Sequence, residues 1–114
     1  YKWEGPITEG PHAGKVGVLI GETADLRQRI KQYVAGTQER GNRLWRESFL
    51  MRCEVRLSTL GFRSLTVASP NGEPSRLGPE AVASANARLV LEQLLVMKAV
   101  STAGDATWVV NARQ

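Results

Sequence analysis

Apolar residues recur at helical spacing in two parts of the chain. In the first, Thr23 or Asp25 can cap the opening turn through a side-chain oxygen, and Gly36 marks the end. The second begins at Pro79 and continues to about Val100. Proline suits a helix start, because the N–H that it lacks would have no partner in the first turn. The buried stripe predicted for the first helix comprises Leu26, Ile30, Tyr33 and Val34.

Short apolar runs predict strands around these helices. The run Lys15–Ile20 is rich in β-branched residues and predicts a buried strand, whereas Phe49–Leu60 alternates charged with apolar residues and predicts a strand with one solvated face. Glycine and proline predict loops at Glu4–Gly14 and Ser69–Gly78. Shorter strands are expected at residues 1–4, 64–68 and 107–110.

The order of these elements predicts one α/β (α+β) domain over residues 1–114, with helices covering a small central sheet. A chain of 114 residues with 42% apolar residues can bury one core. Since no apolar run approaches the roughly 20 residues that span a bilayer, no membrane partner is expected. The chain begins inside its first strand, so we expect it to be part of a longer protein. The single cysteine, Cys53, cannot form an internal disulfide and suits a cytoplasmic protein.

Positive charge is concentrated in the middle of the chain. The net charge is +4, and eight basic residues between Arg27 and Arg56 face only three glutamates. This stretch could bind phosphates, or it could be an ordinary solvated face. The residues expected to bind nucleic acid are Arg27 and Lys31 on the first helix, and Arg40, Arg43, Trp45 and Arg46 on a further helix expected at about 38–47.

The turn from the 15–20 strand into the first helix carries the most specific motif. It reads Leu19-Ile20-Gly21-Glu22-Thr23-Ala24-Asp25-Leu26-Arg27-Gln28-Arg29-Ile30. This segment resembles the second half of the signature of the GIY-YIG nuclease superfamily, in which a strand ending in Tyr-Ile-Gly leads into a helix that opens with Asp/Asn-Leu-x-x-Arg. Downstream, Glu92 stands in the Leu-Glu-x-x-Leu context of that family, and Asn111 stands near the end.

The sequence also departs from the family pattern. Leu19 replaces the tyrosine of the second element, and Tyr1 alone represents the first element. Tyr33 stands where many members have histidine, and Gly61–Pro79 looks like an insertion. His12, the only histidine, lies in a Gly/Pro loop and is expected on the surface.

The resemblance implies a mostly antiparallel sheet flanked by helices and a Mg²⁺-dependent DNA endonuclease. It implies that Arg29 stabilises charge on the phosphate, Glu92 holds the metal ion, Tyr1 assists the nucleophilic water and Tyr33 orients it. Asn111 would tie the tail to the core.

Each of these residues also has a simpler interpretation. Arg29 could be a surface arginine whose stem covers apolar neighbours. Because apolar residues surround Glu92 on the predicted helix, its carboxylate must be paired, protonated or bound to a cation, and Arg88 could pair with it. Tyr1 could be a terminal aromatic, and Tyr33 could serve packing alone. The chain could then be a nucleic-acid-binding domain that has lost cleavage, or a protein-interaction domain on the same fold.

Overall fold

The computed structural model describes residues 1–8, 10–35, 55–61, 63–68 and 71–110. Its main sheet has four strands in the order β3-β1-β2-β6, which are β1 (Lys2–Pro6), β2 (Val16–Ile20), β3 (Arg56–Ser58) and β6 (Thr107–Val109). β1 pairs antiparallel with both β2 and β3, and β6 pairs parallel with β2. The sheet is therefore mostly antiparallel, as expected for a small α+β domain.

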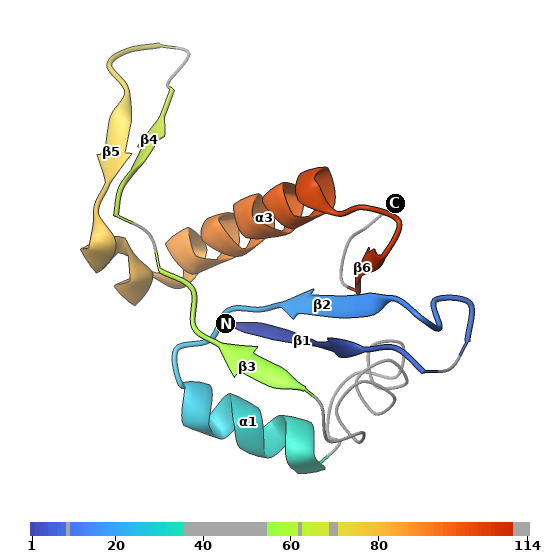
Figure 1. Cartoon of the computed structure of the whole chain (residues 1–114). Coiled ribbons are helices and arrows are strands. Elements are labelled where there is room, and N and C mark those ends of the chain that lie inside the picture. The colour runs from blue at the N-terminus through green and yellow to red at the C-terminus, as the bar shows by residue number, and fades with distance from the viewer. Residues whose placement is uncertain (9, 36–54, 62, 69–70, 111–114) are drawn as a thin grey trace.

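The two main helices lie on opposite sides of this sheet (Figure 1). A hydrophobic core lies on each face of the sheet, and β2 contributes to both because successive side chains of a strand point to opposite faces. Leu19 packs with Ile7 and Tyr33, which belongs to α1 (Leu26–Ala35). The neighbouring positions, Val18 and Ile20, pack instead with Val96 of α3 (Ala85–Thr102) and with Val109 of β6.

Helix α1 begins as the sequence predicts. The Asp25 side chain accepts a hydrogen bond from the Gln28 backbone N–H at 3.1 Å, and Thr23 Oγ1 accepts one from the Asp25 N–H at 3.1 Å. These two acceptors satisfy N–H groups that the first turn cannot pair internally. The turn that follows β2 is thereby fixed to the start of α1.

The second helical region differs from the expected single helix. Pro79–Ala83 forms a short 3₁₀ helix, η1, and α3 begins after Ser84, whose hydroxyl accepts from Ala87 N–H at 3.4 Å. Ser84 has an extended backbone with φ of −90° and ψ of 128°, so it separates the two helices. Proline starts the region as predicted, but the serine cap starts the long helix.

The strands also differ from expectation in three places. β1 continues to Pro6, into the loop expected at Glu4–Gly14, because residues 4–6 pair with β2. β3 is shorter than the predicted strand, of which residues 49–54 lie outside the described residues. The expected loop at 69–78 contains a strand, β5 (Ser75–Leu77), which pairs antiparallel with β4 (Leu65–Val67). The expected 64–68 strand is confirmed as β4, and the two strands form a hairpin that projects from the sheet (Figure 1).

No helix in the described part of the chain is long and apolar enough to cross a membrane.

Candidate functional site

The ring of Tyr1 lies across the backbone of Gly21 at one end of the sheet. The Tyr1 nitrogen donates a hydrogen bond to Gly21 O at 2.9 Å, and Gly21 N donates one to Tyr1 O at 3.0 Å. A Cβ atom at position 21 would lie 2.3 Å from Tyr1 Cζ and from Tyr1 Oη, well inside van der Waals contact. Glycine is therefore required here if the tyrosine ring is to keep its place.

The hydroxyl of Tyr1 meets the hydroxyl of Tyr33. The two oxygens are 3.0 Å apart, and the rings meet edge to face with centroids 6.1 Å apart. Trp3 packs against the other side of Tyr33 with centroids 5.6 Å apart. Tyr33 is only 8% exposed, so it both packs in the core and presents its hydroxyl to Tyr1.

Arg29 lies one helical turn before Tyr33 on α1 and is half-buried. Its Nε atom is buried and has no hydrogen-bond partner in the described part of the chain. A buried donor without an acceptor costs free energy, more so when the group is charged.

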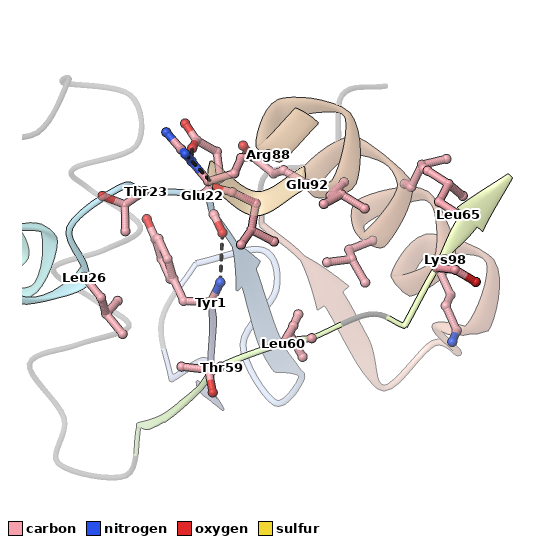
Figure 2. A pocket seen from close by; sticks show the side chains of 17 residues that line it. Tyr1, Glu22, Thr23, Leu26, Thr59, Leu60, Leu65, Arg88, Glu92 and Lys98 are labelled. Atoms are coloured by element: carbon pink, nitrogen blue, oxygen red, sulfur yellow. Dashed lines mark hydrogen bonds and ion pairs between the residues drawn. The ribbon is translucent and has the colours of Figure 1, made fainter. Parts of the chain in front are cut away.

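Glu92 does not form the ion pair with Arg88 that the sequence offered as an alternative. Arg88 turns instead to the loop after β2, where its Nε donates to Glu22 Oε2 at 2.9 Å. Its Nη1 also donates to the Val82 carbonyl at 2.8 Å, which holds the guanidinium in place. Figure 2 shows Arg88 paired with Glu22, with Glu92 beside the pair. This contact could not be predicted from the sequence, because the partners are 66 residues apart.

The surroundings of the Glu92 carboxyl group favour its protonated form. Burial raises the pKa of Glu92 above its ordinary value, and the negative charge of Glu22 raises it further. The ammonium of Tyr1 and the guanidinium of Arg29 lower this pKa by smaller amounts. Arg29 and Tyr1 are therefore close enough to Glu92 to act on its charge, so a residue just before β1 and residues from α1 and α3 lie around one point.

A pocket of about 450 Å³ opens beside this point. Tyr1 and Glu92 line it, together with Arg88, Lys98 and several leucines (Figure 2). The remaining wall comes from the start of α1 and the segment that links β3 to β4.

Two carboxylates stand at the mouth of this pocket, and one of them, Glu22, is already paired with Arg88. Mg²⁺ prefers oxygen ligands, takes one or two carboxylates and keeps several of its waters. The described residues contain no group of three or more His, Cys, Asp and Glu that could hold a metal ion. A divalent cation at this mouth would therefore have Glu92 as its protein ligand and water as its other ligands.

The other residues expected to act lie elsewhere. Arg27 and Lys31 are exposed on α1 and do not line the pocket. His12, expected on the surface, is half-buried and stacks on Trp108 with the ring centroids 4.0 Å apart and the planes 4° apart. Outside the described residues lie Arg40, Arg43, Trp45, Arg46 and Asn111.

The chain was compared with protein-family models, with curated proteins and with solved structures, and it matches none of them. The resemblance to GIY-YIG nucleases therefore depends on the motif residues alone.

Proposed function

We propose that this chain is a divalent-metal-dependent endonuclease domain of the GIY-YIG type that hydrolyses DNA phosphodiester bonds, and that it acts in the cytoplasm. The observation that supports this function best is the convergence of Tyr1, Arg29, Tyr33 and Glu92 from three elements. The hydroxyl groups of Tyr1 and Tyr33 are in contact, and Arg29 is close enough to Glu92 to lower its pKa.

The groups at this point match what phosphodiester hydrolysis requires. The reaction needs an activated water, a cation near the phosphate oxygens and stabilisation of the charge that develops. Arg29, whose positive charge lowers the pKa of Glu92, would place its guanidinium against a phosphate oxygen. Glu92 would hold Mg²⁺, which supplies Lewis-acid stabilisation of the phosphate when it is bound.

The paired tyrosine hydroxyls would position the nucleophilic water. A hydroxyl both donates and accepts, so Tyr33 can hold the Tyr1 oxygen in one orientation at 3.0 Å. An ordinary tyrosine has a pKa near 10 and is a weak base. The tyrosine pair would therefore orient the water, and positive charge nearby would favour loss of a proton from that water. Arg29 is the described side chain that would provide such charge.

A plasmid-nicking assay tests this function. The purified full chain should nick supercoiled DNA in the presence of Mg²⁺, and Arg29→Ala or Glu92→Gln should lower the rate by about 100-fold or more. Arg76→Ala is the matched control, because Arg76 lies exposed on β5 and does not line the pocket. If the wild-type protein does not nick DNA, or if all four proteins nick equally, the proposed function is wrong.

A nucleic-acid-binding domain without cleavage is the second candidate. Leu19 supports it, because Leu19 is 4% exposed inside the apolar core at the position where the family has a tyrosine. This candidate predicts salt-sensitive DNA binding and no nicking with any divalent metal.

A further inference from the structure

The pocket beside Glu92 extends well past the charged groups. Its volume of about 450 Å³ lies in the range of sites that bind small organic groups, roughly 300–1,000 Å³. Beyond Tyr1 and Glu92 the wall is largely apolar and comes from two sides, the β3–β4 segment and α3. The leucines that form it are Leu60, Leu65, Leu91, Leu94 and Leu95.

Charged side chains stand along this apolar wall. Glu92 lies in one part of the pocket and Lys98 lies six residues further along α3, about 9 Å along the helix axis at 1.5 Å per residue. Lys98 is exposed, and Figure 2 shows it well away from the Glu22–Arg88 pair. A ligand that fits this arrangement has an apolar centre and a negative group that reaches Lys98.

Polar groups also line the pocket. Thr59 and Ser64 both line the pocket, and each carries a hydroxyl that can donate and accept a hydrogen bond. Such groups can bind the polar edge of a planar ring whose faces lie against leucines. One nucleotide of a polynucleotide has all three features, since its base has apolar faces and polar edges and its phosphates are negative.

We propose that this pocket binds an unstacked base of the nucleic-acid substrate, next to the phosphate that is cleaved, and that Lys98 binds a neighbouring phosphate. This inference depends on the proposed nuclease function. A base inside an intact duplex is paired and stacked, so it cannot enter the pocket without being extruded. The substrate is therefore nucleic acid with an unpaired nucleotide.

Binding without metal, so that no cleavage occurs, tests this proposal. Fluorescence anisotropy would compare a fully paired DNA duplex, the same duplex with one bulged thymidine, and the same duplex with a bulged abasic residue. We expect the bulged thymidine to strengthen binding about tenfold and the abasic bulge to remove that gain. A single strand of the same sequence distinguishes a free strand from an extruded nucleotide as the preferred ligand.

Two leucines of α3 give a matched pair of variants. Leu94 lines the pocket and is 39% exposed, whereas Leu89 is 48% exposed and does not line it. Leu94→Gln should remove most of the gain from the bulged base, and Leu89→Gln should keep it. Both variants should bind the paired duplex as the wild type does.

The outcomes separate the two proposals. If the abasic bulge binds as tightly as the thymidine bulge, or if both leucine variants behave alike, the base pocket is wrong even where plasmid nicking is observed. If no DNA of any kind binds and none is nicked, the nuclease function fails together with it.

Discussion

At the scale of single residues, Gly21 shows how the motif serves the site. The sequence places a glycine at the end of β2, where it reads as a strand terminator. The structure gives it a second role, since the Tyr1 ring occupies the space that a Cβ atom would fill. A glycine of the motif therefore determines where a proposed catalytic hydroxyl stands.

Gly21→Ala should displace the Tyr1 ring. We expect a loss of about 1–3 kcal/mol in the free energy of unfolding, as is typical of overpacking, together with loss of nicking. Urea denaturation measures the first effect. Gly104→Ala is the control, because a Cβ atom there meets no other atom within 4 Å. Equal stability and activity of the two variants would contradict the tight contact.

Glu92 should lower the stability of the fold while it is ionised. Its pKa is raised in the folded state, so the protein loses stability as the pH rises from the unfolded pKa through the folded pKa. Glu92→Gln removes this loss. At neutral pH the variant should melt higher than the wild type by at most about 4 °C, because the side chain is still partly in water.

Thermal melts at several pH values check this expectation. The difference should disappear at low pH, where Glu92 is protonated in both states. Mg²⁺ should raise the melting temperature of the wild type and leave that of Glu92→Gln unchanged. Glu80→Gln is the control, since Glu80 is an exposed glutamate on η1. A Glu92→Gln variant that melts below the wild type at pH 7 would show that ionised Glu92 is stabilised.

Much of this residue-scale picture could be predicted from the sequence. The Asp25-Leu26-x-x-Arg29 spacing placed Arg29 and Tyr33 on one side of a helix. The apolar residues around Glu92 on the predicted helix indicated that its carboxylate must be paired, protonated or bound to a cation. The Glu22–Arg88 pair could not be predicted in this way. Helical spacing puts Arg88 next to Glu92 on α3, and only the tertiary fold brings Glu22 closer to Arg88.

At the scale of elements, the Glu22–Arg88 ion pair links the loop after β2 to α3. Glu22 has 24% and Arg88 has 17% of the side chain exposed, so water screens the pair only in part. Arg88 offsets the negative charge that Glu22 would otherwise exert on Glu92. The pair thus holds Glu22 near Glu92, and the charge of Glu22 raises the pKa of Glu92.

Two substitutions in this pair should move the acid limb of the pH–rate profile in opposite directions. Glu22→Gln removes a like charge and lowers the pKa of Glu92, so nicking should persist to lower pH. Arg88→Met leaves Glu22 without its counter-charge and raises the pKa of Glu92. As the pH is lowered, this variant should therefore lose nicking at a higher pH than the wild type does. Profiles of the two variants and of Asp105→Asn, an exposed control, measure this. A shift of both variants in the same direction would contradict the role of the pair.

The elements were predictable where one face is clearly buried. β2 and α1 have clear apolar patterns and appear close to their expected positions. α3 is apolar on nearly all sides, so its sequence could not show which side faces the sheet. Leu89, expected near Glu92 among buried neighbours, is 48% exposed, as are Val90 and Val100. β5 has no such pattern, because it pairs only with β4 in a projecting hairpin.

At the scale of the whole molecule, the net charge of +4 favours association with a polyanion. The charges near the pocket are more specific than this total. Arg29, Arg88 and Lys98 oppose Glu22 and Glu92 there, and a bound divalent cation would add two further positive charges. A phosphate backbone that approaches this mouth therefore meets net positive charge, although two carboxylates stand at its centre.

This distribution predicts how DNA binding should respond to salt. Each phosphate contact releases counterions, so the logarithm of the binding constant falls with the logarithm of salt concentration, by about 0.9 per contact on duplex DNA. If Arg29 and Lys98 each contact a phosphate, Arg29→Ala and Lys98→Ala should each reduce that slope by about one. Anisotropy titrations over a range of salt concentrations measure the slopes.

Lys2→Ala is the matched control for these slopes. Lys2 lies on β1 with its Nζ 3.9 Å from Glu4 Oε1, so its charge is already opposed within the sheet. The Lys2→Ala substitution should therefore leave the salt slope of DNA binding unchanged. If Lys2→Ala changes the slope as much as Lys98→Ala does, binding follows total charge and the DNA is not held at the pocket mouth. If only the two pocket-side variants change it, the backbone passes close to Glu92, where cleavage requires it.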